Sequence, residues 1–163
     1  MKTSDRHLGG NLYIAAAILN STRCNLGLDM AHVVNRTIDT FKNYLNVPDN
    51  LNVRIGACPK SYSGRYIHAH RTIELSYKLN WRQAMEVLAH EMVHAEQYHE
   101  GRLSHTFQRG KFKWLWYGKT FNNHRTYTAY REQPWEQEAF DRQTMITEWV
   151  IRDLDEQYGD KHV

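Results

Sequence analysis

The sequence has few cysteines, no long hydrophobic run and no repeat, and each absence excludes a class of protein. Cys24 and Cys58 are too few for a disulfide scaffold and match no metal-binding spacing, so we expect both to be reduced. No apolar run approaches the roughly 20 residues that span a bilayer. The longest, residues 12–19, lacks a small-residue cleavage site, which argues against a signal peptide. We therefore expect a cytoplasmic protein without membrane contact, in the host cytoplasm if the source is viral.

Neither sign of charge dominates the sequence. The 21 Lys and Arg residues against 18 Asp and Glu give a net charge of +3, which alone does not indicate a nucleic-acid binder. A length of 163 residues with 41% hydrophobic residues fits one globular domain over 1–163, with residues 1–10 fraying. One count is high, because 10 residues are histidine, the commonest metal ligand.

Periodicity and turn residues predict the elements of this domain. We expect helices over 11–21, 29–45, 80–98 and 134–158, strands over 51–57, 65–70 and 72–77, and a hairpin over 112–121. Asn80 with Gln83 resembles a capping box, and Pro134 suits the first position of a helix. Helices, a small antiparallel sheet, a helix, a hairpin and a helix in this order predict an α+β fold.

The helix expected over 80–98 contains the sequence HEMVH at 90–94, which matches the HExxH pattern. Residues four apart on a helix lie one above the other, so His90 and His94 can bind one ion. Glu91 projects beside them, where its carboxylate can act as a general base on a water at that ion. The pattern favours Zn2+, which accepts imidazole nitrogen and lowers the pKa of bound water to roughly 7. The alternative is an ordinary helix whose two histidines face water.

A catalytic zinc site normally has three protein ligands, so a third is needed. His99 points away from the pair on the same helix, and His105 would have to fold back towards it. A carboxylate is the better candidate, and the start of the last helix offers Glu136 and Glu138. These two flank the apolar face of that helix on opposite sides, so its periodicity leaves both open. At least one of them is expected only to stabilise the helix N-terminus.

These motifs resemble small zinc metallopeptidases of phage and bacterial genomes, relatives of the gluzincin and SprT-like groups. The resemblance covers about residues 61–140 and rests on HEMVH at 90–94, WYGK at 116–119 and PWEQEA at 134–139. It implies a zincin-like fold in which the HExxH helix is followed by a β-hairpin and a C-terminal ligand helix. It also implies that Glu136 is the third ligand, with Ala139 as the small residue three positions later.

One position departs from that family pattern. Many such families place Asp or Asn four residues after the ligand, where it orients a histidine. Here Phe140 stands at that position and the nearest acid is Asp141. Glu138 therefore stays open as the alternative ligand.

The resemblance implies that the chain hydrolyses peptide bonds in a protein or peptide substrate, with Glu91 as the general base. It further implies an edge strand before the metal helix that pairs with the substrate backbone, and Thr72–Ser76 occupies that place in chain order. An oxyanion donor is usually needed as well. The segment between hairpin and last helix offers Tyr127, Tyr130, His124 and Arg131.

Two other classes of function remain open. SprT-like proteins act on protein crosslinked to DNA, which makes a nucleic acid a candidate partner. Basic residues between Arg102 and Arg131 interleave with aromatic ones, and these two residue types together bind single-stranded nucleic acid. A solvated hairpin would have the same composition. The third class is a non-catalytic protein that keeps a metal for stability or regulation.

Overall fold

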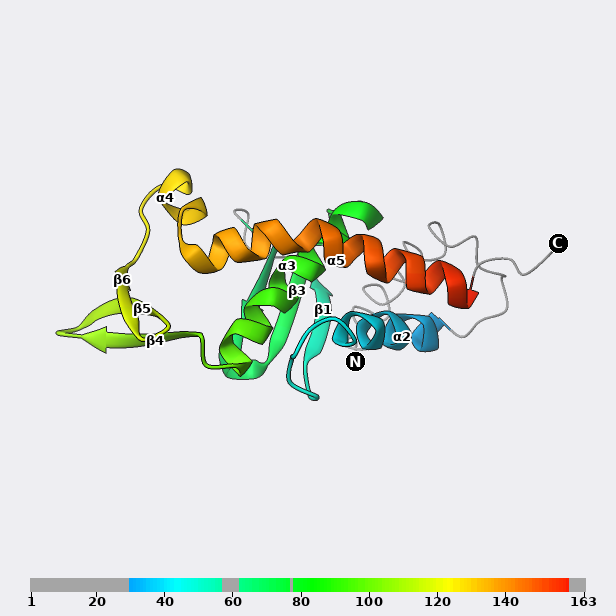
Figure 1. Cartoon of the computed structure of the whole chain (residues 1–163), viewed down its shortest axis with the longest axis horizontal. Helices are drawn as coiled ribbons and strands as arrows, with labels where there is room; N and C mark the ends of the chain where they lie inside the picture. The colour runs from blue at the N-terminus through cyan, green and yellow to red at the C-terminus, as the bar shows by residue number, and fades with distance from the viewer. Residues whose placement is uncertain (1–29, 57–61, 77, 159–163) are drawn as a thin grey trace, which may run out of the picture.

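The computed structural model of the chain describes residues 30–56, 62–76 and 78–158 (Figure 1). In chain order these contain α2 (Met30–Lys42), β1 (Asn52–Gly56), β2 (Gly64–Ile67), the 3-10 helix η1 (His68–His70), β3 (Thr72–Ser76), α3 (Trp81–His99), β4 (Leu103–Gln108), β5 (Lys111–Trp116), β6 (Lys119–Asn122), α4 (Tyr127–Arg131) and α5 (Pro134–Tyr158). The fold is α+β, as predicted. The fraying predicted for residues 1–10 and the helix predicted over 11–21 lie outside the described residues. Within those ranges, no helix is long and apolar enough to span a bilayer.

The first sheet is mixed and has the strand order β1–β3–β2. β1 runs parallel to β3, whereas β2 runs antiparallel to it, so the predicted antiparallel sheet is wrong for β1. The prediction that Thr72–Ser76 is an edge strand is also wrong, because these residues form the central strand β3. Ile73 and Leu75 on this strand are fully buried, and a backbone buried with them needs hydrogen-bond partners on both sides. The edges of this sheet are β1 and β2.

The second sheet is an antiparallel meander, β4–β5–β6, that projects beyond the end of α3 (Figure 1). The hairpin predicted over 112–121 is confirmed as β5 and β6, and β4 is a further strand that the sequence analysis did not predict. The two connections are Arg109-Gly110 and Tyr117-Gly118, and all four residues have positive φ. This is the geometry of two-residue hairpin turns, in which glycine at the second position avoids strain.

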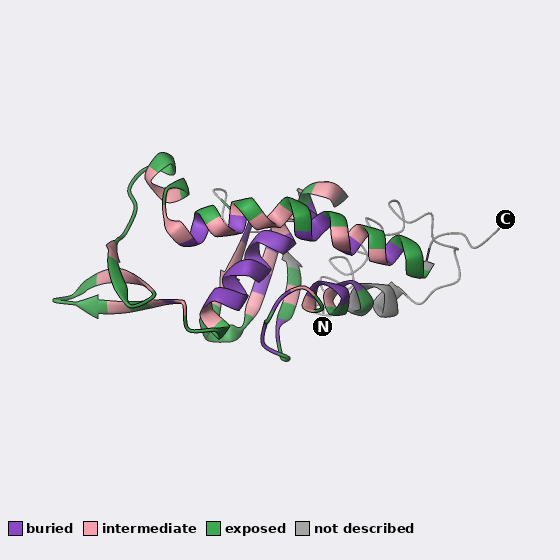
Figure 2. Ribbon diagram, viewed as in Figure 1, coloured by how far each residue is buried: buried purple, intermediate pink, exposed green. Residues whose placement is uncertain are grey.

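α3 is the central element of the core and carries the HExxH sequence. It begins at a capping box, in which the Asn80 side chain accepts from the Gln83 N–H and the Gln83 side chain accepts from the Asn80 N–H, as predicted. Figure 2 shows α3 buried along most of its length, and Leu88 and Met92 are among its fully buried side chains. α5, which begins at Pro134 as predicted, packs along α3. A rigid helix pair therefore supports the site.

β2 lies directly on α3 at Gly64. A Cβ at this position would lie 2.5 Å from Val87 Cγ1 and 3.1 Å from the Glu74 carbonyl oxygen. We therefore expect Gly64→Ala to lower the free energy of unfolding by about 1–3 kcal/mol through overpacking. Gly56→Ala is the matched control, since nothing lies within 4 Å of a Cβ there. Urea denaturation measures both variants, and equal stability of the two would contradict the close packing of β2 on α3.

Candidate metal centre

Two helices bring three potential metal ligands together. His90 and His94 come from adjacent turns of α3, and Glu136 comes from the first turn of α5. His90 Nε2 lies 3.2 Å from His94 Nε2 and 3.2 Å from Glu136 Oε2, and His94 Nε2 lies 3.3 Å from the same oxygen. All three side chains are buried. The three atoms therefore form a nearly equilateral triangle of potential metal ligands.

Two glutamines determine which ring nitrogen of each histidine carries the proton. His94 Nδ1 lies 2.9 Å from Gln97 Oε1, and Gln97 Nε2 donates to the Trp135 carbonyl at 3.0 Å, which fixes the orientation of the amide. His90 Nδ1 lies 2.9 Å from Gln143 Oε1. Each Nδ1 therefore donates its proton to a glutamine oxygen, and each Nε2 of a neutral imidazole keeps a free lone pair. When both imidazoles are neutral, these lone pairs and a carboxylate face one another, an arrangement that a cation stabilises.

The size of the triangle fits a tetrahedral zinc ion. With zinc–ligand bonds of about 2.0–2.1 Å, ligand atoms in a tetrahedron lie about 3.3–3.4 Å apart. The corresponding distances here are 3.2–3.3 Å. Two imidazoles and one carboxylate are a common ligand set of catalytic zinc sites, which leave the fourth position to water or substrate. The residues present therefore suit zinc.

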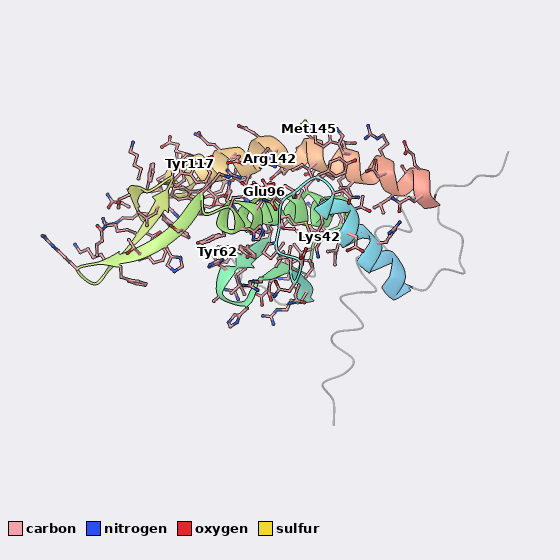
Figure 3. All side chains as sticks on the ribbon, turned by 60° about the horizontal axis from the view of Figure 1, so that its bottom comes forward. Lys42, Tyr62, Glu96, Tyr117, Arg142 and Met145 are labelled. Carbon is pink, nitrogen blue, oxygen red and sulfur yellow. The ribbon has the colours of Figure 1, made fainter. Side chains whose placement is uncertain are left out.

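Glu138, the alternative ligand, is bound elsewhere. Its carboxylate accepts hydrogen bonds from Arg102 Nη1 at 2.6 Å and from Arg142 Nη1 at 2.7 Å. Arg142 also donates to the buried Glu96 of α3 at 2.5 Å (Figure 3). Burial alone would raise the pKa of Glu138, but the two arginines hold it below its usual value. Of the two carboxylates that the sequence left open, the structure brings Glu136 to the histidines and places Glu138 in an ion-pair network.

Glu91 lies beside the three ligands and is anchored on the edge strand β2. The backbone N–H of Tyr66 donates a hydrogen bond to the Glu91 carboxylate. Burial raises the pKa of Glu91, although the imidazoles of His94 and His90 act in the opposite direction. A buried carboxylate with a raised pKa suits a general base, because it binds a proton more readily than an exposed one.

One of the four candidate oxyanion donors reaches the cluster. The Tyr130 hydroxyl donates a hydrogen bond to the Glu136 carboxylate. Burial and the charge of Glu136 raise the pKa of Tyr130, so its phenol stays protonated. The other three lie differently: Tyr127 is exposed, Arg131 covers an aromatic ring of α5, and His124 packs on the ring of Tyr130.

The remaining candidates for the third ligand lie away from the cluster. His99 is exposed at the end of α3. His105 belongs to β4, where it is exposed and stacks on Phe112 with the ring centroids 5.4 Å apart. Both were weaker candidates in the sequence, and neither contributes to the group around Glu136.

The groups that orient the histidines are not the ones that the resemblance implies. Asp141 is exposed, and Phe140 packs against the His90 ring with centroids 4.5 Å apart. Gln97 and Gln143 take the orienting role, and the sequence analysis missed both. A signal for Gln97 was present, because it lies three residues after His94 and therefore on the same side of the helix. Gln143 comes from α5 and carries no such local signal.

Gln97→Leu is expected to weaken zinc binding by about 10–100-fold, because it removes the acceptor that orients His94. The change also removes the hydrogen bond to the Trp135 carbonyl, so it loosens the contact between α3 and α5. Gln137→Leu on the exposed face of α5 is the control for the same substitution. Competition with a chromophoric chelator measures the affinities. Equal affinities of the two variants would argue against an orienting role for Gln97.

The titration of His94 links metal binding to pH. Burial alone would lower the pKa of His94 in the metal-free chain, but the hydrogen bond and charge of Glu136 raise it to about 9. Its protonated form therefore stabilises the metal-free fold fully below the unfolded pKa of 6.5, and this contribution is lost as the pH rises through about 9.

Zinc needs the neutral imidazole of His94, so we expect zinc binding at pH 7 to release about one proton. The affinity for zinc should therefore rise with pH up to about 9. Titration calorimetry in two buffers with different ionisation enthalpies measures the number of protons released. The same heat in both buffers would contradict a protonated His94.

Basic and aromatic side chains alternate between the two faces of β5. Phe112 and Trp114 lie on one face of the strand, and Lys111 and Lys113 lie on the other. The aromatic face continues onto α5, where Trp135 lies 5.5 Å from Trp114. Basic and aromatic residues therefore alternate along this part of the sequence because successive side chains of a strand point to opposite faces. The lysines of β5 therefore lie on the face opposite its aromatic rings, whereas single-stranded nucleic acid would need cations and stacking rings on one surface.

Comparisons with known proteins identify no relative of this chain. No family model matches it, and no curated protein or solved structure matches it significantly. The resemblance to gluzincin and SprT-like peptidases therefore rests on the motifs alone, and the geometry of the site carries the functional argument.

Proposed function

We propose that this chain is a zinc-dependent metallopeptidase with a zincin-like site. The triangle of His90 Nε2, His94 Nε2 and Glu136 Oε2, with sides of 3.2–3.3 Å, carries the proposal. Its support is the chemistry of the donors, since three buried acceptor atoms of this spacing suit a tetrahedral cation. Two histidines of an HExxH helix with a glutamate of a later helix are also the ligand set that the resemblance to gluzincins implies.

Each neighbouring group has a role in peptide hydrolysis. A zinc ion held by the three residues would supply the Lewis acidity that activates a water and polarises a peptide carbonyl. Glu91 would take the proton from the attacking water and deliver it to the leaving amine. Tyr130 keeps its proton, so its hydroxyl can exchange the hydrogen bond to Glu136 for one to the oxyanion that develops.

The substrate backbone would pair with the edge of β2. Among the described residues no strand pairs with β2 on the side away from β3, and the Tyr66 N–H of this strand already contacts Glu91. An extended peptide added to this edge would pass the general base. The proposal therefore gives β2 the role that the sequence analysis assigned to Thr72–Ser76.

The test combines metal analysis with an assay of cleavage. The purified chain is expected to hold about one zinc and to cleave members of a proteome-derived peptide library, and a chelator should abolish the cleavage. Zinc retention without any cleavage would favour the non-catalytic alternative, and a chain that binds no zinc would refute both. Binding to single-stranded DNA that weakens steeply with salt, without cleavage, would favour the nucleic-acid alternative.

A further inference from the structure

A row of ring side chains leads from the edge strand β2 to the tip of the β4–β6 sheet. We call it the aromatic strip, and its members are Tyr66, His68, Tyr98, His105, Phe112 and Phe107. Ring centroids lie 5.9 Å apart for Tyr66–Tyr98, 4.3 Å for His68–Tyr98, 6.3 Å for Tyr98–His105, 5.4 Å for His105–Phe112 and 5.6 Å for Phe107–Phe112. Four segments that are separate in sequence, β2 with η1, the end of α3, β4 and β5, thus contribute to one surface.

The strip begins at the candidate metal centre and ends in solvent. Tyr66 is half-buried, and its backbone N–H binds the Glu91 carboxylate. Phe107 at the far end is 69% exposed, and His68 and His105 are also exposed. Tyr98 and Phe112 between them are half-buried. A contiguous row of rings that reaches the solvent is typical of a binding surface, whereas single exposed apolar residues are common everywhere. Because the aromatic strip begins beside Glu91, we expect that the molecule bound to it is the substrate itself.

The direction of β2 determines which part of a substrate would reach the strip. β2 and η1 run alongside α3 in the same direction, because successive residues of both segments meet in the same order. Gly64 lies on Val87, Tyr66 reaches Glu91 and His68 stacks on Tyr98. A substrate strand antiparallel to β2 therefore runs from the β4–β6 sheet towards the start of α3. Its residues N-terminal to the scissile bond would lie along the strip.

The length and charge of this surface narrow the class of substrate. The ring contacts from Tyr66 to Phe112 span at most about 18 Å, which about five residues of extended chain would cover. Arg109 stands in the β4–β5 turn, two residues after Phe107, and residues 103–131 contain no Asp or Glu, so the charge at the outer end of the strip is positive. A surface of rings with positive charge at its outer end suits a substrate that has large apolar side chains near the scissile bond and acidic side chains further from it.

We infer that the aromatic strip binds the polypeptide substrate N-terminal to the scissile bond. It selects extended segments with large apolar side chains about two to five residues before that bond, in an acidic context. The inference rests on the proposed peptidase function. A polypeptide fits better than a nucleic acid, because the strip starts at the general base and the β5 lysines lie on the opposite face of the sheet.

The experiment maps cleavage sites in the full zinc-loaded chain. The probe is a Lys-C peptide library of a bacterial proteome, with cleavage sites identified by mass spectrometry. We expect enrichment of Phe, Tyr, Trp and Leu before the cleaved bond, and a loss of that enrichment in Phe107→Ser. For a peptide carrying such residues, Phe107→Ser should lower kcat/KM by about five- to tenfold. Met145→Ser is the control, since it removes an apolar side chain that is 46% exposed on α5.

The possible outcomes separate this inference from the proposed function. A zinc-loaded wild type that cleaves no peptide would refute the peptidase proposal, and the inference with it. Cleavage without upstream preference, or equal effects of Phe107→Ser and Met145→Ser, would overturn the inference alone. Binding of a 20-nucleotide oligo-dT that Phe107→Ser weakens would assign the strip to nucleic acid and also overturn it. If Phe107→Ser melts below the assay temperature, His105→Ala repeats the test at another exposed position of the strip.

Discussion

Glu91→Gln is expected to lower kcat for peptide hydrolysis by about 10²–10⁴-fold while the chain keeps its zinc. Glutamine has nearly the same shape as glutamate, and its amide oxygen can still accept the hydrogen bond from the Tyr66 N–H. The glutamine cannot take a proton from water, so the variant loses proton transfer but keeps metal binding. Steady-state kinetics on a cleaved library peptide, with the zinc content of the same preparation, measure both quantities.

The control for this variant is Glu86→Gln on the same helix. Glu86 forms a partly exposed ion pair with Arg82 at 3.2 Å, and such pairs contribute little to stability. We expect this variant to keep the wild-type kcat. Undiminished turnover in Glu91→Gln would exclude Glu91 as the base and remove the proposed mechanism.

Glu136→Gln and Glu138→Gln are expected to separate metal binding from stability. Glu136→Gln should weaken zinc binding by more than about 100-fold, since losing the anionic ligand costs more than losing a group that only orients a ligand. Glu138→Gln should keep the zinc but lower the free energy of unfolding by about 1–3 kcal/mol. The reason is that it weakens two charged hydrogen bonds, from Arg102 and Arg142.

Competition with a chromophoric chelator measures the zinc affinity of both variants, and urea denaturation in the presence of EDTA measures their stability. Loss of zinc in Glu138→Gln together with its retention in Glu136→Gln would reverse the assignment. In that case Glu138 would be the ligand, and the contacts of its carboxylate with Arg102 and Arg142 would have to break in the zinc-bound chain.

Local signals in the sequence predicted the elements that carry the site. The capping box at Asn80 and the proline at 134 predicted where α3 and α5 begin, because helix ends are decided by a few neighbouring residues. The spacing of His90 and His94 predicted a shared ion, because it depends only on the pitch of one helix. Turn residues and aromatic content likewise predicted the β5–β6 hairpin.

Features that depend on contacts between distant segments could not be predicted in the same way. Strand order in the first sheet depends on packing, which puts β3 between β1 and β2. Glu136 and Glu138 lie equally far from the apolar centre of α5, so only the position of Arg102 and Arg142 distinguishes them. The approach of Tyr130 to Glu136 requires the short helix α4, which the sequence analysis did not predict.

The ion-pair network of Glu96, Arg102, Glu138 and Arg142 joins α3 to the beginning of α5 through protein groups alone. It holds the beginning of α5, and Glu136 with it, against α3. The proposed zinc ligands are therefore held together by protein contacts, whereas small domains that fold only around a metal lack such contacts. Under the proposed function we expect the chain to fold without zinc, so that the free zinc concentration of its surroundings sets the fraction of zinc-loaded chains.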